Sequence, residues 1–351
     1  MLIDSLLPQE IDAAATRASQ LSDCGYDGAW VGESAHDPWL QSLVAAERAP
    51  AAQVGTAVVI AFARSPMTVA SSAFDLARYT EGRFVLGLGT QIRPHIERRF
   101  SMPWSDPVER MRDFMAALRA IWAAWSFGVP LRHRGPYYTH DLMTPVFSPA
   151  AHRWGAPPVY LAAVGKGMLR LTGEGADGLI VHPFHSRAYL DDVIRPAVAD
   201  GARSAGRAPE DVAVVGSVLV ATGSDAAELA AATEIVRGWL SFYASTPAYR
   251  AVLAHHGWAD LHEPMRALSK EGRWDEMARC LPDEVVRGLA VVGPPDEAGR
   301  IIAERYAGRA DRLSLNLAGD PAPAVHAAVV AAVRAGLTPR GASTARPSPS
   351  P

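Results

Sequence analysis

One loop of the sequence carries two side chains that could move a proton. Glu33 and His36 stand three residues apart in the segment WVGESAHDPWL, directly after the apolar stretch 27–31. A carboxylate and an imidazole on one loop suit general acid–base catalysis because each group can take up and release a proton. The same segment equally suits a helix cap formed by Ser34 or Asp37, with His36 exposed to solvent.

A second segment, AAVGKG at 162–167, has the features of an anion-binding turn. It ends an apolar stretch and opens a helix that we expect at 167–175. Free backbone N–H groups at a helix N-terminus bind anions, and Gly165 and Gly167 would let a phosphate approach the backbone closely. Lys166 would add a positive charge. The alternative is an ordinary turn with a solvated lysine.

Two histidines, His182 and His185, follow the apolar stretch 178–181. Two imidazoles three residues apart can bind a metal ion, but no further cysteine, histidine or carboxylate stands at a spacing that completes a ligand set. We therefore expect polar groups that line a pocket, and we expect no metal site.

A glycine-rich turn, VLGLGT at 85–90, precedes an arginine-rich segment. A dinucleotide-binding fingerprint would need a third glycine at position 92, where isoleucine stands, so we expect Gly89 to allow close backbone approach instead. The basic side chains that follow suit an anionic ligand, or surface ion pairs with Glu97, Asp106 and Glu109. They are Arg93, Arg98, Arg99, Arg110 and Arg112.

These candidates share a position in the expected secondary structure, because each lies at or after the end of a short apolar stretch. Eight such stretches alternate with helix-like segments, which predicts parallel strands with right-handed crossovers. The result is either a closed α/β barrel, the (β/α)₈ TIM barrel, or a doubly wound sheet. We favour the barrel because no change of composition divides the chain, and barrel active sites lie in the loops that follow the strands. The expected strands are 2–7, 27–31, 54–61, 84–88, 159–163, 178–181, 212–221 and 312–317, and the expected helices are 10–24, 40–48, 66–79, 107–125, 167–175, 187–206, 224–244, 294–306 and 321–335.

Two insertions interrupt this alternation. The stretch 128–142 has a Gly-Pro pair between polar and aromatic residues and predicts an inserted hairpin. The stretch 246–290, rich in histidine, tryptophan and arginine, predicts an irregular helical excursion that forms either a lid or a solvated helix face. We expect a single domain over 1–337 and a disordered tail, rich in proline and serine, at 338–351.

The composition of the 351 residues is that of a globular protein, with 49% hydrophobic residues, 20% charged residues and a net charge of −3. This charge gives no general attraction to nucleic acid or to a membrane surface. The two cysteines are isolated, and the N-terminal segment lacks the basic region and the apolar run of a signal peptide or membrane span. We expect a cytoplasmic protein with no nucleic-acid or membrane partner.

Taken together, these segments resemble the luciferase-like monooxygenase superfamily, in order, over about residues 1–336. The segment HIERRFSMPWSDPVERM resembles an actinobacterial subgroup whose members depend on coenzyme F420, a deazaflavin. The resemblance implies a luciferase-like TIM barrel with a cofactor in its mouth. The segments that carry the wider resemblance are CGYDGAWVGE, GTAVVIAFARSPMTVA, GRFVLGLGTQ, YLAAVGKGMLRLTGEGADGLIVHPF and VVGPPDEAGR.

The resemblance also implies roles for individual residues. A non-prolyl cis peptide bond is implied between Ala57 and Val58, beneath the cofactor ring, and Trp39 matches a ring-lining tryptophan of the family's sugar-phosphate dehydrogenase. Where relatives often carry Asp-His, this chain carries Glu33 followed by serine, and either Glu33 or His36 would transfer the proton. The implied cofactor-binding residues are Trp39, Ala57, Val58, Gly89, Gln91, Ala162, Ala163, Val164, Gly165, Lys166, Gly167 and His182.

The activity implied by the resemblance is that of an F420-dependent oxidoreductase, which transfers a hydride between the deazaflavin and a small organic substrate. Two alternatives stay open. The first is an FMN-dependent luciferase-like monooxygenase, which would consume oxygen. The second is a deazaflavin-binding protein without turnover. Barrels of this family often dimerise, so a homodimer fits the resemblance as well as a monomer does.

Overall fold

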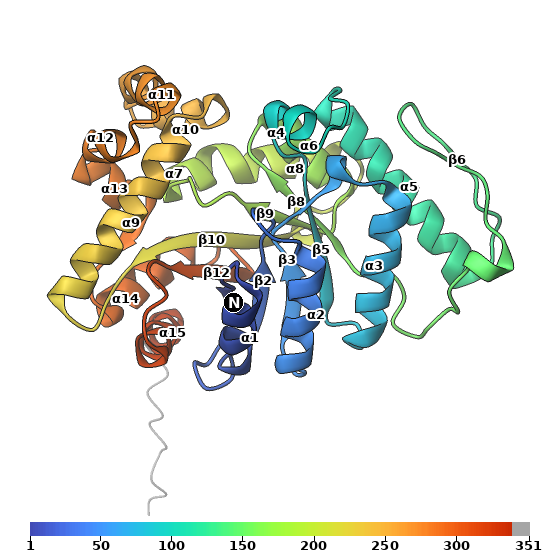
Figure 1. Cartoon of the computed structure of the whole chain (residues 1–351), viewed down its shortest axis with the longest axis horizontal. Coiled ribbons are helices and arrows are strands. Elements are labelled where there is room, and N and C mark those ends of the chain that lie inside the picture. Colours follow the sequence, from blue (N-terminus) through green and yellow to red (C-terminus); the bar gives the residue numbers. More distant parts are fainter. Residues whose placement is uncertain (339–351) are drawn as a thin grey trace, which may run out of the picture.

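A closed barrel of eight parallel strands forms the centre of the molecule and confirms the predicted TIM barrel (Figure 1). The structure is a computed structural model that describes residues 1–338. Pairing of β9 with β10 closes the ring, so the alternative of a doubly wound sheet is wrong. The barrel strands are β1 (Leu2–Leu6), β2 (Gly28–Val31), β3 (Gln53–Thr56), β5 (Phe84–Gly89), β8 (Val159–Ala163), β9 (Gly178–Val181), β10 (Ala213–Ala221) and β12 (Arg312–Leu317).

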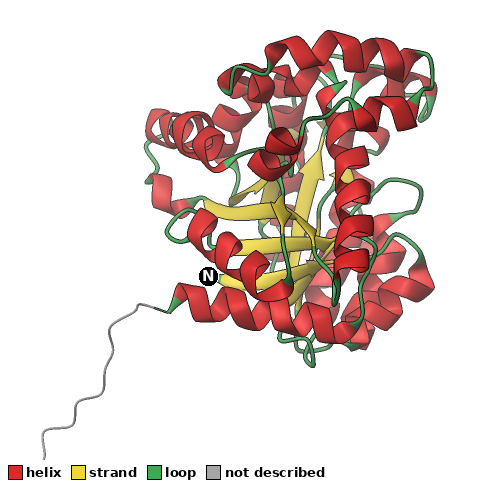
Figure 2. Cartoon of the chain, turned by 90° about the vertical axis from the view of Figure 1, so that its left-hand side faces the viewer, coloured by secondary structure: helices red, strands yellow, loops and turns green. Residues whose placement is uncertain are grey.

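Helices surround the barrel because each parallel crossover returns along the outside of the sheet (Figure 2). The predicted helix 10–24 ends early, at Ser19, and the turns that follow end at Gly25, whose φ of 77° is left-handed. The predicted helix 187–206 is interrupted by a π-helical turn, Leu190–Ile194. The surrounding helices are α1 (Ile11–Ser19), α2 (Pro38–Arg48), α3 (Pro66–Tyr79), α4 (Arg93–Arg98), α5 (Pro107–Phe127), α6 (Lys166–Gly175), α7 (Arg187–Tyr189), α8 (Arg195–Ser204), α9 (Ala226–Ala244), α14 (Pro295–Tyr306) and α15 (Pro323–Leu337).

Three of these helices begin directly after a residue whose side chain caps the helix N-terminus. The side chains of Asp37, Ser65 and Asp106 accept hydrogen bonds from first-turn N–H groups of α2, α3 and α5. A proline follows each cap, where its missing N–H costs no intrahelical hydrogen bond. The loop before α2 therefore contains a helix cap, as one of the two interpretations of its sequence expected.

Short elements fill both predicted insertions. Strands β6 (His133–Arg134) and β7 (Thr139–His140) form an antiparallel pair in the region of the predicted hairpin. The carboxylate of Asp113 anchors this pair, because it accepts the backbone N–H groups of Tyr137 and Tyr138 at 2.7 and 2.9 Å. The region of the predicted excursion contains α10 (Arg250–His255), α11 (His262–Lys270), α12 (Trp274–Arg279) and α13 (Asp283–Leu289).

Two further strands extend the sheet. β4 (Val59–Ile60) pairs with β5, and β11 (Val291–Val292) pairs with β10. Among residues 1–338, no helix has the length and apolarity that a membrane crossing requires. Apart from Thr338, the predicted disordered tail lies outside the described residues.

Large and small side chains interlock inside the barrel. A Cβ atom at Gly55 would lie 2.4 Å from the ring of Trp30, and one at Gly178 would lie 2.7 Å from the ring of Tyr160. These two glycines therefore make room for the aromatic rings, whose centroids lie 6.2 Å apart. The lumen is a packed core below its open end.

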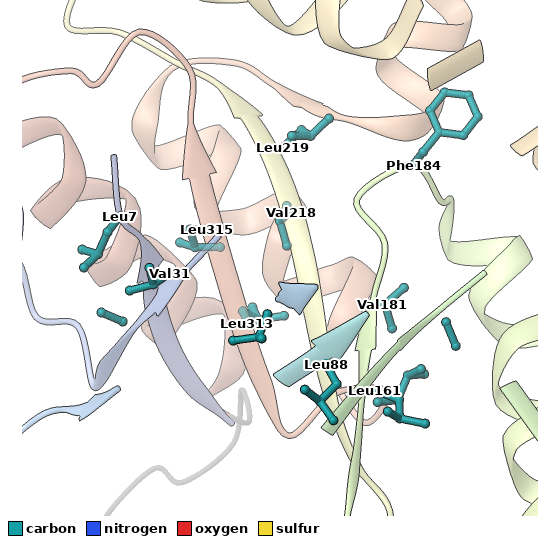
Figure 3. Packing of buried hydrophobic residues seen from close by; sticks show 14 of the residues in the cluster. Leu7, Val31, Leu88, Leu161, Val181, Phe184, Val218, Leu219, Leu313 and Leu315 are labelled. Atoms are coloured by element: carbon teal, nitrogen blue, oxygen red, sulfur yellow. The ribbon is translucent and has the colours of Figure 1, made fainter. Parts of the chain in front are cut away.

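A buried ion pair lies in this lumen, toward the N-terminal ends of the strands. Oδ1 of Asp4 lies 2.6 Å from Nη2 of Arg312, and Oδ2 accepts a hydrogen bond from Nε1 of Trp30 at 2.8 Å. Burial raises the pKa of Asp4, and the guanidinium and the indole N–H act against that rise. Side chains on the opposite faces of the strands belong to a larger hydrophobic cluster that also contains side chains of the helices. Figure 3 shows part of this cluster, including Leu88 and Leu161.

Candidate functional site at the barrel mouth

The loops after the strands meet at one end of the barrel, called the mouth here, because all the barrel strands run parallel. The predicted site residues lie in the loops after β2, β3, β5, β8 and β9, at the ends of these strands, or at the start of the next helix. The fold therefore brings segments that are far apart in the sequence to one end of the molecule.

Small side chains form the floor of the mouth. Ala57, Val58 and Ala162 are partly exposed and pack on the lumen cluster that contains Trp30. The peptide bond between Ala57 and Val58 is cis, as the resemblance implied. A Cβ atom at Gly89 would lie 2.5 Å from Cγ2 of Val58, so only glycine lets β5 approach this turn so closely.

The start of α6 offers free hydrogen-bond donors beside this floor. Gly165 is the N-cap and supplies no side-chain hydrogen bond to the first turn. Gly165, Lys166 and Gly167 are exposed, and a Cβ atom at Gly165 would meet nothing within 4 Å. An anion can therefore reach the first-turn N–H groups, where the helix dipole also favours negative charge.

His182 lies at the mouth, because it is the first residue after β9. Gly178 and Ile180 of this strand face the lumen, and His182 follows two positions after Ile180. Nδ1 of His182 accepts the backbone N–H of Phe184 at 3.1 Å, and Nε2 lies 2.9 Å from Oη of Tyr249. Burial, with a smaller contribution from the nearby His185, lowers the pKa of His182 to about 3, so the ring is neutral at pH 7.

His185 faces the other way and does not line the mouth. Its Nδ1 lies 2.8 Å from the carbonyl oxygen of His182, and its Nε2 lies 3.0 Å from Oη of Tyr306, on the outer helix α14. The carbonyl can only accept, so Nδ1–H donates to it and Nε2 accepts the hydroxyl of Tyr306. Of the two histidines expected to line a pocket, the structure places only His182 there.

Glu33 is engaged in an ion pair at the edge of the mouth. Its side chain is 5% exposed, and Nη1 of Arg64 donates to Oε1 at 2.9 Å and to Oε2 at 2.8 Å. The backbone N–H of Ile60 also donates to Oε2, at 2.7 Å. These contacts fasten the loop after β2 to the segment after β4. Proton transfer by Glu33 stays a prediction.

His36 and Trp39 lie outside the lumen cluster. Nε2 of His36 lies 3.1 Å from Oε1 of Glu10, and the His36 side chain is 41% exposed. The ring of Trp39 packs with that of Phe84 at a centroid distance of 6.2 Å, in the layer between α2 and the sheet. Contact of Trp39 with a cofactor ring stays a prediction, which its present contacts do not support.

The segment after β5 carries exposed arginines around a buried isoleucine, Ile96. Gln91 has a φ of 58°, and its Oε1 accepts the backbone N–H of Ile92 at 3.0 Å. Arg93 pairs with Glu97 at 3.0 Å, one of the surface ion pairs that the sequence allowed. Arg98 is exposed and follows on the same short helix, α4.

The helical excursion contacts the loop after β9. Nε2 of His256 lies 2.7 Å from Oγ of Ser186, and Nε2 of His255 lies 3.3 Å from Oδ2 of Asp192. His262 is buried, at 2% exposure. His262 is therefore not on a solvated helix face, because its Nδ1 lies 2.8 Å from the carbonyl oxygen of Ala244 in α9. His255 is exposed, and a lid formed by the excursion stays a prediction.

The model of the luciferase-like monooxygenase family matches residues 4–313. The chain belongs to this family. An uncharacterised protein of Mycobacterium tuberculosis is 48% identical over 311 residues, which are 89% of this chain and 92% of the relative. The 5,10-methylenetetrahydromethanopterin reductase of Methanolobus tindarius is 27% identical over 286 residues, which are 80% of this chain and 82% of that enzyme.

A solved structure extends the likeness to the fold. The coenzyme F420-dependent tetrahydromethanopterin reductase of Methanopyrus kandleri has a TM-score of 0.77 and 18% identity, with 94% of this chain and 96% of that chain covered. At this identity the likeness is one of fold.

The mouth of this luciferase-like barrel suits a flat ring that carries a phosphate. The side chains of Ala57, Val58 and Ala162 are small, so they would leave room for a ring above them. The glycines at 165 and 167 leave the start of α6 accessible to a phosphate. The residues present therefore fit a flavin or a deazaflavin.

One residue of the mouth in this luciferase-like chain was not foreseen from the sequence. Tyr249 stacks on His182, with ring centroids 4.3 Å apart, and comes from the turn after α9. In the sequence, the excursion is distinguished by its histidines, tryptophans and arginines. The local sequence signal for Tyr249 is a Pro-Ala-Tyr turn directly after a long helix. Such a turn does not indicate which part of the barrel the tyrosine contacts.

Proposed function

We propose that this luciferase-like protein is a coenzyme F420-dependent oxidoreductase that transfers a hydride between the deazaflavin and a small organic substrate. The observation that carries the proposal is the combination, in one mouth, of a low floor at Ala57, Val58 and Ala162 with the open N-terminus of α6 at Gly165. The reductase from Methanolobus tindarius among the relatives supports reduction as the chemistry. The F420 dependence of the Methanopyrus kandleri enzyme, which has the same fold, supports the deazaflavin.

In this proposal, the cofactor supplies the hydride chemistry and the chain supplies binding and orientation. The backbone from Val164 to Gly167 binds the phosphate, and Ala57, Val58 and Ala162 support the ring. Gly89, Gln91 and His182 would border the same space, whereas Ala163 is buried in the hydrophobic cluster outside the lumen and would not contact the cofactor.

Either Glu33 or His36 is the proton-transfer residue that the resemblance implies. His36 is the more accessible of the two, because the Glu33 carboxylate already accepts hydrogen bonds from Arg64 and Ile60. Assays of oxidation and reduction with variants at Glu33 and at His36 separate a chemical role of each side chain from a purely structural role.

The experiment that tests the proposed cofactor is a titration of the purified protein with F420 and with FMN. F420 carries a phosphodiester and a tail of glutamates, so exposed arginines such as Arg93, Arg98 and Arg99 would add weak, salt-sensitive attraction. We expect F420 to bind at least about tenfold more tightly than FMN, equivalent to about 1.4 kcal/mol. The difference between the two affinities should narrow as the salt concentration rises. Equal or tighter binding of FMN at low salt contradicts the proposal.

A second candidate is an FMN-dependent monooxygenase on the same scaffold. The observation that favours it is the match of 4–313 to a family described by its monooxygenases. Oxygen uptake in step with substrate turnover, together with FMN binding, would establish this alternative. F420 binding without hydride exchange to any acceptor would instead indicate a binding protein.

A further inference from the structure

The protonation of His182 follows from its hydrogen bonds. Its Nδ1 accepts the backbone N–H of Phe184, so Nδ1 carries no proton. The low pKa of the ring leaves it neutral at pH 7, and a neutral imidazole keeps one proton. That proton is therefore on Nε2, which donates to Oη of Tyr249 at 2.9 Å.

The hydroxyl proton of Tyr249 is consequently free. Oη of Tyr249 accepts from His182, and within residues 1–338 it has no second hydrogen-bond partner. Burial raises the pKa of Tyr249, so the hydroxyl stays protonated across the working pH range. The structure therefore holds an oriented donor whose own proton is available to a ligand.

This donor lies at the mouth. His182 directly follows β9, two positions after Ile180, and Ile180 packs in the same cluster as Ala57 and Val58. The rings of His182 and Tyr249 are stacked and both are partly exposed. Because His182 stands at the C-terminal end of a barrel strand, the Tyr249 hydroxyl that is bonded to it lies at the mouth.

We propose that Tyr249 donates its hydroxyl proton to the oxygen of a carbonyl substrate, with His182 as its positioning residue. The substrate class is then a ketone or aldehyde in the reducing direction and an alcohol in the oxidising direction. This inference rests on the proposed function, which supplies the hydride donor or acceptor.

The step balances in atoms and electrons. The carbonyl carbon gains a hydride, the π pair of the C=O bond moves to oxygen, and that oxygen takes the proton of Tyr249 to give an alcohol. The Nε2–H of His182 stabilises the phenolate that remains, and water at the open mouth returns the proton. The same steps in reverse oxidise an alcohol.

The matched pair of variants is Tyr249→Phe and Tyr243→Phe. Both tyrosines contact the ring of His182, at 4.3 and 4.8 Å between centroids, but only Tyr249 is hydrogen-bonded to it. Turnover is followed by oxidation of reduced F420 with a panel of aliphatic, cyclic and aromatic ketones and aldehydes. We expect Tyr249→Phe to lower kcat by about 100-fold or more, the range of a single acid or oxyanion donor, and Tyr243→Phe to lower it much less.

F420 affinity, measured by quenching of its fluorescence, is the readout that does not depend on turnover. We expect Tyr249→Phe to leave this affinity unchanged. A large loss of affinity would assign the hydroxyl to the cofactor and overturn the proposal. An equal loss of kcat in both variants would assign Tyr249 to packing and also overturn it. If the wild-type protein binds F420 but reduces no carbonyl in the panel, this inference fails while the proposed function stands; if F420 does not bind, the proposed function fails.

A second measurement needs no cofactor. Long-range ¹H–¹⁵N NMR of the histidine-labelled protein distinguishes the two neutral tautomers from the imidazolium. We expect His182 to be neutral at pH 7 with its proton on Nε2, and to keep that tautomer in Tyr249→Phe. A neutral ring with its proton on Nδ1 would make Nε2 the acceptor of the Tyr249 hydroxyl, so that proton would not be free and the proposal would be overturned. A charged ring at pH 7 would carry a proton on Nδ1, which could not accept the N–H of Phe184, and would overturn the positioning role of His182.

Discussion

The carboxylate of Glu33 is bound to the guanidinium of Arg64, with 2.8 Å between Oε2 and Nη1, and the two side chains are 5% and 17% exposed. This pair joins the loop after β2 to the segment after β4, which are adjacent in space at the edge of the mouth. A carboxylate that holds two loops together has a structural task whether or not it also moves a proton.

Replacement of Glu33 by glutamine should therefore lower stability. Hydrogen bonds to charged groups typically contribute about 1.5–3 kcal/mol, so we expect Glu33→Gln to lower the free energy of unfolding by an amount in this range. Urea denaturation measures it. Asp37→Asn is the control, because Asp37 is 43% exposed in its pair with Arg64 and asparagine still caps a helix, so a loss below about 1 kcal/mol is expected. Unchanged stability of Glu33→Gln with lost turnover would point to direct catalysis.

The start of α6 can be tested at Gly165. Aspartate there would add bulk and negative charge where the proposed phosphate binds, so F420 affinity should fall by about 100-fold or more, roughly 2.7 kcal/mol. Alanine is the matched control: a Cβ atom at Gly165 meets nothing within 4 Å, and its φ of −78° suits any residue. Gly165→Ala should change the affinity by less than about threefold. If Gly165→Asp binds F420 as tightly as the wild type does, the phosphate binds elsewhere.

Removal of one partner from the buried pair in the lumen should strongly destabilise the barrel. Arg312→Met would leave the carboxylate of Asp4 buried without its cation, and such changes typically lower the free energy of unfolding by about 3–5 kcal/mol. The double variant Asp4→Leu/Arg312→Met removes both charges and should recover much of this loss. Chemical denaturation of the three proteins gives the comparison. A double variant as unstable as Arg312→Met alone would show that packing, and not charge, determines the effect.

Acid should destabilise the protein through its buried histidines. Burial, with a smaller effect of Arg17, lowers the pKa of His326 from 6.5 to about 4. The unfolded chain binds this proton near pH 6.5 and the native state binds it only near pH 4, so the stabilising contribution is present above pH 6.5 and is lost as the pH falls toward 4.

His326→Gln tests this contribution. At pH 5 the expected cost from one such histidine is about 2 kcal/mol, because each pKa unit corresponds to about 1.4 kcal/mol. The variant should therefore lose less stability than the wild type between pH 7 and pH 5, as measured by urea denaturation at each pH. An identical pH dependence in the two proteins would contradict a depressed pKa for His326.

The sequence alone was sufficient to favour the barrel over a doubly wound sheet and to place the candidate site at one end of it. Apolar stretches such as 84–88 and 178–181 alternate with helix-like segments, and the hydrophobic pattern that produces a buried parallel strand is local in the chain. Once the strands are parallel, the loops that follow them must meet at one end, so the positions of Gly89, Gly165 and His182 at the mouth followed from the strand order.

Only the tertiary structure decided what these side chains contact. Glu33 meets Arg64, 31 positions away, and His182 meets Tyr249, 67 positions away. Trp39 packs with Phe84 in the helix layer. Such contacts depend on how loops and inserted helices pack over the mouth, and no periodic pattern encodes that packing. The sequence therefore determined where the candidate site lies, and the packing of distant segments determined which hydrogen bonds each side chain can still make.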